Sequence, residues 1–411
     1  MAQLFRHATK CIGSQEFSLA ASRYDIVTVG GGIAGSAFAR AMAQRGAKVL
    51  VLEKETRFRD RVRGEGIVPW GVAEARELGI LEILRAGCGH DVPLVEGGMG
   101  PRDMASTTLP GLPGLCFAHQ EMQETLLAAA ESAGGEVQRG VTVSGIEPGA
   151  SPAVIVDGQR ISARLVIAAD GRGSACRKWG GFSVKEHSND YYMAGVMLSD
   201  ATAPTDTFYF IFNPQFGMCI GVVPIGRNRH RAYYMYPKSM PYRLQGTQML
   251  DLFFTESARC YAPLAEYYAG AKCIGPLASF DVSDSWVEHP YRDGVVLMGD
   301  AAVTTDPTFG QGLSLALRGS RILRDELSKD SDWAAGANRY AEQQGRYSRA
   351  CVTVEGWMRT LFQDPSPEST RLRERAMPLI AQDPTRVPDH IFSGPELPIN
   401  DEVRARFFGE C

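Results

Sequence analysis

Residues 25–53, DIVTVGGGIAGSAFARAMAQRGAKVLVLE, decide the fold because they combine a strand, a glycine turn, a helix and a second strand. DIVTVG is a short β-branched run, and Gly30, Gly32 and Gly35 give the spacing G-x-G-x-x-G where the strand turns into the helix. Gly30 permits the tight turn, Gly32 lets the backbone approach a pyrophosphate, and Gly35 lets the helix pack closely on the strand. The Ala-rich helix is predicted to end at Gly46, and KVLVLE is predicted to form the next strand.

Glu53 closes this βαβ motif at the end of its second strand. An acidic side chain about 20 residues after the glycines can accept hydrogen bonds from ribose hydroxyls, and the helix N-terminus offers free N–H groups to a phosphate. A glycine cluster by itself is more often an ordinary turn. Strand, spacing, helix and terminal acid together predict an ADP-containing cofactor, with NAD and FAD both open at this point.

The composition excludes several classes of protein. The chain has 411 residues and 44% apolar content, enough for two or three domains with a large core. A net charge of −4 argues against nucleic-acid binding, which normally needs a basic surplus. Nine cysteines without a C-x-x-C pair and seven dispersed histidines predict no disulfide framework, no metal site and a reducing, cytoplasmic location.

The N-terminal segment and the apolar runs bear on membranes and targeting. No apolar run reaches the roughly 20 residues that span a bilayer, so no membrane span is predicted. Residues 1–23 are mildly basic and lack the apolar core of a secretory signal. We interpret them as a flexible N-terminal extension, with a transit peptide as the weaker alternative.

A basic loop follows the first motif. Arg61 and Arg63 lie just downstream of Glu53, where guanidinium groups could clamp a pyrophosphate; a solvated basic loop is an equally good interpretation from these residues alone. The loop leads into a helix with apolar residues at helical spacing between 73 and 84. Residues 91–118 are rich in Gly and Pro and predict strands and turns, and a helix is predicted at 120–133.

Two further strands end in acidic residues. LVIAADGRGSACRKWG places Asp170 and Gly171 after a buried strand, and GVVLMGD ends in Gly299 and Asp300. Strand ends carry ligands in open α/β sheets. The loop DPTFGQG then leads into a helix that begins near Leu313, so a second helix N-terminus is predicted beside Asp300.

The region between these motifs has a different composition. Residues 183–281 contain strands full of Tyr, Phe and Met, such as DYYMAGVML and HRAYYMYP. An aromatic stripe is more often plain core than a binding wall. One face of such a sheet laid over a cofactor would nevertheless suit an apolar or aromatic ligand.

These three stretches in this order resemble the single-component FAD-dependent monooxygenases with the fold of p-hydroxybenzoate hydroxylase, a superfamily that also includes flavin-dependent halogenases and geranylgeranyl reductases. The resemblance spans residue 24 to about residue 327. DGRGSACR matches the family's D-G-x-x-S-x-x-R pattern with Asp170, Gly171, Ser174 and Arg177, RVRGEG is similar to its Arg-x-Arg loop, and GDAAVTTDPTFGQG matches its GD motif.

The resemblance implies a set of FAD-binding residues. The first motif would hold the ADP half, the Arg-x-Arg loop would also bind FAD, and Asp170 would lie beside FAD and the NAD(P)H route. In the GD motif, Asp300 would bind the ribityl and pyrophosphate region, and Pro307 and residues 310–313 would line the isoalloxazine. His119 or Gln120 could face the phosphates at the start of the helix near 120, and Gln120 is our choice. The implied residues are Gly30, Gly32, Ile33, Ala34, Gly35, Glu53, Lys54, Arg61, Arg63, Gln120, Asp170, Gly171, Gly299, Asp300, Pro307, Gly310, Gly312 and Leu313.

Several positions depart from the family patterns. Val303 stands where many members have His after GDAA, and Ser314 stands where Asn is common. The W-x-W-x-I-P segment of halogenases is absent, because the nearest candidate, GMCIGVVP, contains no tryptophan. The aromatic pattern of geranylgeranyl reductases is absent too. The absence of these two patterns favours the monooxygenases within the superfamily.

The predicted fold class is α/β, with a Rossmann-type FAD-binding domain, a smaller β-rich substrate domain and a helical C-terminal region. The FAD-binding domain is predicted at 24–182 and again at 291–330, with residues 91–118 contributing strands to the substrate domain. The substrate domain is predicted at 183–290 and the helical region at 331–411.

The resemblance implies a monooxygenase that uses NADPH or NADH and O2 to hydroxylate or epoxidise an aromatic or apolar small molecule through a flavin C4a-hydroperoxide. No catalytic residue is assigned, although Tyr192, Tyr209, His230 or Tyr234 could serve as a base toward a phenol. The alternatives are an FAD-dependent reductase or halogenase-like enzyme fed by an external electron donor, and a non-catalytic flavin-binding protein. A monomer or a homodimer is expected.

Overall fold

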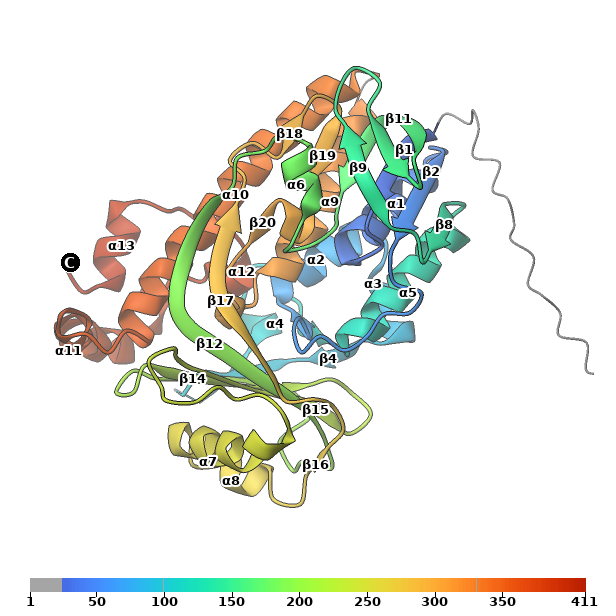
Figure 1. Cartoon of the computed structure of the whole chain (residues 1–411). Helices are drawn as coiled ribbons and strands as arrows, with labels where there is room; N and C mark the ends of the chain where they lie inside the picture. Colours follow the sequence, from blue (N-terminus) through green and yellow to red (C-terminus); the bar gives the residue numbers. More distant parts are fainter. Residues whose placement is uncertain (1–23, 99, 330) are drawn as a thin grey trace, which may run out of the picture.

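The computed structural model describes residues 24–98, 100–329 and 331–411, and the predicted N-terminal extension, residues 1–23, lies outside them. Its first sheet has the strand order β18-β19-β11-β1-β2-β8, and β9 and β10 extend it beside β11 (Figure 1). The strands are β1 (Tyr24–Val29), β2 (Val49–Glu53), β8 (Glu136–Arg139), β9 (Val143–Glu147), β10 (Ala153–Val156), β11 (Gln159–Ala168), β18 (Tyr291–Arg292) and β19 (Val295–Leu297).

The predicted βαβ unit forms at the centre of this sheet. β1 pairs in parallel with β2, with Ile26 opposite Val49, and α1 (Ile33–Ala43) connects the two strands. Small side chains let α1 bury most of its surface against the sheet. The helix ends at Ala43 rather than at Gly46, because residues 44–46 form a turn in which Gly46 has φ +84°, a conformation that glycine adopts readily.

The second sheet lies below the first in Figure 1 and has the order β20-β17-β12-β15-β14-β13-β5-β6, with β16 paired to β12. The long strands β12 and β17 of this sheet form an antiparallel pair that reaches up toward the first sheet in Figure 1. The strands are β5 (Leu94–Glu96), β6 (Pro101–Asp103), β12 (Lys185–Ser199), β13 (Thr207–Asn213), β14 (Met218–Pro224), β15 (Arg229–Pro237), β16 (Lys272–Cys273), β17 (Ala278–Trp286) and β20 (Val303–Thr304).

Helices cover the outer face of the second sheet. α7 (Leu250–Cys260) and α8 (Leu264–Tyr267) follow the short helix η1 (Thr247–Met249) and lie below β14 and β15 in Figure 1. Phe253 and Leu264 pack with Tyr234 and Tyr236 in one buried cluster. The sequence interpretation of 183–281 emphasised strands and missed these helices.

The segment 91–118 divides between two sheets. β5 pairs with β13 in the second sheet, and β6 pairs with β5 at the edge of that sheet. β4 (His90–Val92) and β7 (Gly114–Cys116) form a three-stranded sheet with β3 (Gly66–Ile67), and residues 104–107 form the short helix α4 (Met104–Thr107). The single helix predicted after the basic loop is two, α2 (Pro69–Glu77) and α3 (Leu81–Gly87), because Gly79 between them has φ +67°.

The remaining helices complete the predicted fold class, which is confirmed. α5 (His119–Ser132) packs against α1, and α6 (Ala175–Trp179) follows the second motif. The GD motif runs through η2 (Gly299–Ala301) and η3 (Pro307–Phe309) into α9. The last helices are α9 (Gly312–Lys329), α10 (Trp333–Phe362), α11 (Pro367–Gln382), η4 (Pro384–Arg386), α12 (His390–Ser393) and α13 (Asp401–Phe407). Within the described residues, none of these helices is both long and apolar enough to cross a bilayer.

Candidate active site

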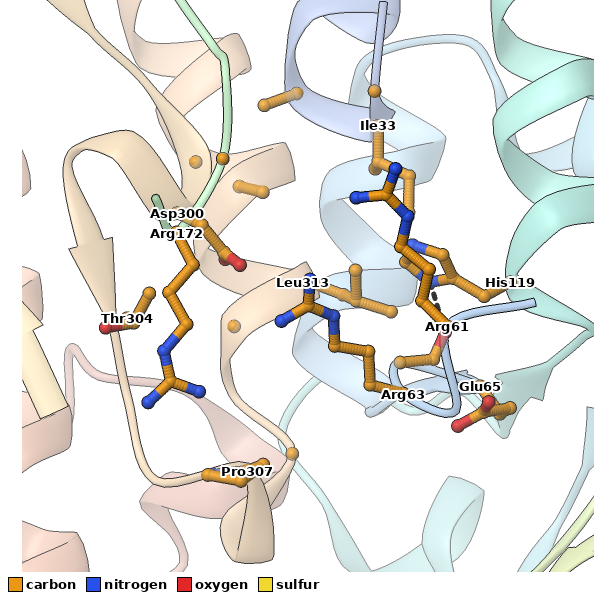
Figure 2. Close-up of a pocket in the computed structure, with 18 of the residues that line it drawn as sticks. Ile33, Arg61, Arg63, Glu65, His119, Arg172, Asp300, Thr304, Pro307 and Leu313 are labelled. Atoms are coloured by element: carbon orange, nitrogen blue, oxygen red, sulfur yellow. Dashed lines mark hydrogen bonds between the residues drawn. The ribbon is translucent and has the colours of Figure 1, made fainter. Parts of the chain in front are cut away.

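A cavity of about 710 Å³ lies between the two sheets and is lined by residues from both. It runs past the glycine turn after β1, the basic loop after β2, the end of β11 and the GD motif (Figure 2). Apart from Gly35 and Gln120, every residue of the set implied by the resemblance lines this cavity. Tertiary structure therefore brings together motifs that are up to about 280 residues apart in the sequence.

The glycine turn forms a cradle at one end of the cavity. Gly30 has φ +99°, and a Cβ atom there would lie 2.4 Å from the carbonyl oxygen of Ala169 on the neighbouring chain segment. Gly32 is the N-cap of α1, and no side chain caps this helix. The first N–H groups of α1, at Ile33 and Ala34, therefore stay available to an anion.

Gly35 has a different place from the other glycines of the motif. It does not line the cavity but packs α1 against β1, since a Cβ atom at Gly35 would lie 2.1 Å from the carbonyl oxygen of Gly30. This is the close helix-strand packing for which the motif needs its third glycine.

Glu53 is 5% exposed and fixes the loops on both sides of it. Its Oε2 accepts a hydrogen bond of 2.7 Å from the Gly31 N–H, and its Oε1 accepts one of 2.8 Å from the Glu55 N–H. Each carboxylate oxygen has a second lone pair. The side chain is thus held rigidly at the cavity wall with acceptor capacity to spare for ribose hydroxyls.

The basic loop sends two guanidinium groups into the cavity. In Figure 2, Arg61 and Arg63 extend into the same space, and Asp300 lies across from them. Arg61 is half-exposed and donates a hydrogen bond of 2.7 Å to Glu55 Oε1. Within the described ranges the side chain of Arg63 has no hydrogen bond or ion pair, so its donors are free to meet an anion.

His119, and not Gln120, faces the cavity at the start of α5. Its Nδ1 lies 2.8 Å from the carbonyl oxygen of Gly64, and because a carbonyl only accepts, Nδ1 carries the proton. Burial lowers the pKa of His119. Gln120 lies outside the cavity, and its Oε1 is buried without a hydrogen-bond partner among the described residues. The sequence offered both residues as candidates. Only the structure shows how the helix is rotated about its axis, and therefore which of the two side chains faces the cavity.

Asp170 lies beside Gly30 at the end of β11. Its Oδ2 accepts a hydrogen bond of 3.1 Å from the Cys176 N–H, whereas its Oδ1 is buried and has no partner in the described part of the chain. Arg177 of the same motif is buried and donates 2.7 Å from Nε to the carbonyl oxygen of Ala301. The D-G-x-x-S-x-x-R motif, residues 170–177, thereby holds the GD motif in place. It also leaves one carboxylate oxygen of Asp170 free to accept a hydrogen bond from a ligand.

Arg172 was not in the sequence-derived set but lines the cavity. It donates hydrogen bonds to the carbonyl oxygens of Asp281 (3.1 Å) and Ser283 (3.0 Å) on β17, so it links the loop after β11 to the second sheet. Figure 2 shows its side chain running down from beside Asp300 toward the loop of Pro307. Arg172 occupies the first of the two variable positions in D-G-x-x-S, so the motif gave no signal for this role.

The GD motif turns sharply beneath the cavity. Asp300 faces the cavity, and burial raises its pKa against the opposing effect of Arg63. Asp306 is fully buried and caps η3, since its Oδ1 accepts a hydrogen bond of 2.9 Å from the Thr308 N–H. Gly310 then takes a left-handed conformation, φ +66°, which aims the N-terminus of α9 at the cavity.

A buried acidic cluster supports this loop from behind. Arg359 of α10 contacts Asp306 Oδ2 at 2.7 Å and Asp284 Oδ2 at 3.6 Å, and Glu355 lies one turn earlier on the same helix. Glu355 is 1% exposed, and neither of its carboxylate oxygens has a hydrogen-bond partner in the described residues. Two acids thus contact one guanidinium group, and burial raises the pKa of the third acid, Glu355, well above its usual range.

Asp284 makes the stability of this cluster depend on pH. Burial, with Asp306 nearby, raises its pKa from 3.8 to about 6, against the opposing effects of Arg359 and His187. The folded state therefore binds this proton more tightly than the unfolded state, and the stabilisation present below about pH 4 is lost as the pH rises through 6, by up to about 3 kcal/mol.

We expect Asp284→Asn to flatten the fall in stability between pH 4 and pH 6. Urea unfolding at several pH values measures this slope, and Asp293→Asn, at an exposed turn, is the matched control and should keep the wild-type slope. An Asp284→Asn slope equal to that of the wild type contradicts the assignment.

The far end of the cavity is apolar. Side chains from the inner face of the second sheet and from the segments beside it form its wall, among them Met104, Met193, Phe208, Phe210, Met235 and Phe280. The four base candidates considered from the sequence, Tyr192, Tyr209, His230 and Tyr234, are absent from this wall. The described residues contain no group of three or more His, Cys, Asp or Glu side chains that could hold a metal ion.

The glycine turn at one end of the cavity and the apolar wall at the other are typical of a protein that binds a nucleotide cofactor next to a small apolar ligand. A family model for the FAD binding domain matches residues 23–340, more than three quarters of the chain, and the chain belongs to this family. The predicted FAD cofactor and the predicted membership of the superfamily of p-hydroxybenzoate hydroxylase-like FAD-dependent monooxygenases are confirmed. The protein is an FAD-dependent oxidoreductase.

Similar proteins include two curated relatives and one solved structure. The chain is 26% identical over 362 residues to rifampicin monooxygenase of Streptomyces venezuelae, covering 85% of this chain and 74% of that protein. It is 28% identical over 323 residues to 6-methylpretetramide 4-monooxygenase of Streptomyces rimosus, covering 72% of each. It shares the fold of Klebsiella pneumoniae HpxO, solved with FAD and uric acid, at a TM-score of 0.75 and 23% identity over 90% of this chain and 97% of that one.

Proposed function

We propose that this protein is an FAD-dependent monooxygenase that uses NAD(P)H and O2 to hydroxylate or epoxidise an aromatic or apolar small molecule. The observation that carries the proposal is one continuous cavity, with a dinucleotide cradle at one end and an apolar wall at the other. The names of the two curated relatives, both monooxygenases, support it.

The residues around the cavity fit FAD. The uncapped N-terminus of α1 and the Arg63 side chain suit a pyrophosphate, and Glu53 suits a ribose. Asp170 Oδ1 is a buried acceptor that no described residue satisfies, and such atoms normally have a partner in the complete complex. We assign these four groups, together with Asp300, to the cofactor.

When bound, FAD would supply the redox chemistry: it would take a hydride from NAD(P)H and activate O2, so that one oxygen atom reaches the substrate and the other leaves as water. The protein's part is position, exclusion of water and electrostatics. The apolar wall excludes water. The N-terminus of α9, aimed by Gly310, would stabilise negative charge on a reduced cofactor by about 0.3–2 kcal/mol.

Anaerobic reduction and a substrate screen test the proposal. The purified protein should release FAD on denaturation, and NADPH or NADH should bleach its flavin absorption, with or without a substrate present. Aromatic and polyketide-like compounds should then be screened for stimulated NAD(P)H oxidation with an oxygenated product. Reduction only by an external reductase would favour the reductase or halogenase-like alternative, and flavin that no donor reduces would favour a non-catalytic binder.

Glu53→Ala should weaken FAD binding. The variant loses the ribose acceptor and the contacts that fix Gly31 and Glu55, so we expect the FAD dissociation constant to rise at least about tenfold, ~1.4 kcal/mol. Fluorescence titration of the apoprotein with FAD measures it. Glu147→Ala, which removes a half-exposed carboxylate on β9, is the control and should bind FAD as the wild type does. Unchanged affinity in Glu53→Ala refutes the role of Glu53.

A further inference from the structure

Two segments that are far apart in the sequence meet at the apolar end of the cavity. One is residues 102–109, which include α4, and the other is residues 389–393, which include α12. Met104 of the first segment and Ile391 and Phe392 of the second line the cavity. The line along which these two segments meet, called the seam below, is therefore part of the cavity wall.

The outer side of the seam faces solvent. Leu109 is 76% exposed, and the side chains of Arg102 and Asp389 are 35% and 26% exposed. The guanidinium carbon of Arg102 lies over the Phe392 ring, 5.4 Å from its centroid. Since Phe392 lines the cavity and Arg102 meets solvent, a single layer of side chains separates the cavity from solvent here.

Side chains, and not backbone pairing, hold the seam closed. Arg102 Nη1 donates a hydrogen bond of 2.7 Å to Asp389 Oδ1, and the Leu109 N–H donates one of 3.0 Å to Ser393 Oγ. No backbone–backbone hydrogen bond joins the two segments, both of which the structure describes throughout. Half-exposed ion pairs contribute little to stability, so the closed seam is only weakly favoured over an open one.

Arg102 is the residue on which the closed seam depends. Besides its bond to Asp389, its Nε donates 2.8 Å to Thr107 Oγ1 and its Nη2 donates 3.0 Å to the Thr107 carbonyl oxygen. The guanidinium group therefore holds the end of α4 and the start of α12 at once, and it makes a cation–π contact with Phe392. Loss of Arg102 frees both sides of the seam together.

The place of the cofactor makes a separate entrance useful. The glycine turn, Glu53 and the basic loop lie at the other end of the cavity, so FAD held by them would fill that end. An apolar ligand that used the same mouth would have to pass the cofactor. An opening at the seam reaches the apolar wall directly and leaves the cofactor in place.

We propose that the seam is the portal through which the apolar substrate enters and the product leaves, and that Arg102 is the positioning residue that keeps it closed in between. This inference rests on the proposed function, since a small molecule must enter and leave at each turnover. Leu109 places an apolar side chain at the outer rim, where an apolar ligand first makes contact. The polar groups that part on opening are already partly exposed, so water replaces their partners.

Two cysteines of the cavity wall report opening without a substrate. Cys116 and Cys219 line the cavity and are 4% and 3% exposed, whereas Cys351 of α10 is buried outside it. FAD-loaded protein is treated with N-phenylmaleimide, a small aromatic thiol reagent, and the labelling of each cysteine is timed by mass spectrometry. In Arg102→Met the two cavity cysteines should react at least about fivefold faster than in the wild type, because an ion pair and a cation–π contact are lost. Cys351 should keep its wild-type rate, which separates opening of the seam from global unfolding.

Arg160→Met is the matched control. Arg160 of β11 also has an ion pair of 2.7 Å, with Glu147, and donates 2.8 Å to the Ser151 carbonyl oxygen, but it does not line the cavity. This variant should label the cavity cysteines at the wild-type rate. Asp389→Asn, a smaller change at the same contact, should accelerate them as Arg102→Met does, and the double variant should be less than about twofold faster than Arg102→Met because one contact is lost in all three.

The proposal is overturned if neither Arg102→Met nor Asp389→Asn accelerates the cavity cysteines relative to Cys351. It is also overturned if FAD protects Cys116 and Cys219 equally in the wild type and in both variants, because the reagent then enters through the cofactor end. These measurements use no NAD(P)H and no substrate, so they can succeed when turnover fails. A protein that oxygenates its substrate although the seam stays closed refutes the portal alone.

Discussion

Gly35→Ala is expected to destabilise the protein by about 3 kcal/mol or more and to abolish FAD retention. The added Cβ would lie 2.1 Å from the carbonyl oxygen of Gly30, 3.0 Å from Thr28 Cγ2 and 3.3 Å from Ala169 Cβ. The nearest atom belongs to the backbone of the cofactor turn, which cannot move without separating α1 from β1. Overpacking of this kind typically costs 1–3 kcal/mol, and a clash with backbone lies at the upper end.

Urea unfolding and the FAD content of the purified variant measure this effect. Gly356→Ala in α10 is the matched control, because a Cβ atom there meets nothing within 4 Å and the position is helical. Alanine should raise the stability at this helix position by up to about 1 kcal/mol. A Gly35→Ala protein that holds FAD and unfolds at the wild-type urea concentration would contradict the close packing of α1.

Arg359→Met is expected to cost about 3–5 kcal/mol, because it removes the guanidinium group that two buried acids contact. Asp306 and Asp284 would lose their ion pairs, and Glu355 would gain two uncompensated neighbours. Asp306 caps the turn that leads to Pro307 in the cavity wall. The variant should therefore also lose FAD more readily than the wild type does.

The loss should be smaller in acid, since protonation of Asp284, whose pKa is raised by burial, removes one of the negative charges that Arg359 no longer compensates. Urea unfolding at pH 5.5 and pH 8 measures the difference. Arg349→Met removes a half-exposed arginine from the same helix, where it contacts Glu288 at 3.2 Å, and should change the stability by less than about 1 kcal/mol. An equal loss for Arg359→Met at both pH values argues against a role in compensating buried charge.

The aromatic strand β15 shows where sequence reasoning reached its limit. The sequence HRAYYMYP offered His230 and Tyr234 as candidate bases and gave no reason to place Tyr233 in the cavity instead. Side chains alternate along a strand, so Tyr233 and Met235 line the cavity while Tyr234 faces α7 and α8. Both faces of this sheet are covered and rich in apolar residues, and no alternation in the sequence marked one face as the site.

The cofactor end was far more predictable than the substrate end. Three features of the cofactor end follow from local backbone geometry: the positive φ of Gly30, the acid Glu53 at a strand end and the uncapped N-terminus of α1. Their spacing in the sequence fixes their positions relative to one another. Gln120 and His119 are adjacent on one helix, and a rotation of about 100° per residue decides which of them faces the cavity.

By itself, the sequence determined the βαβ unit, the FAD-binding motifs and the fold class, because each rests on residues close together in the chain whose backbone conformations are constrained locally. Only the tertiary structure decided which face of the aromatic sheet meets the cofactor cavity, that Arg172 links the two sheets, and that Glu65 meets Tyr233 and Arg231. Those contacts join residues more than 100 positions apart, and their partners are selected by how the two sheets pack.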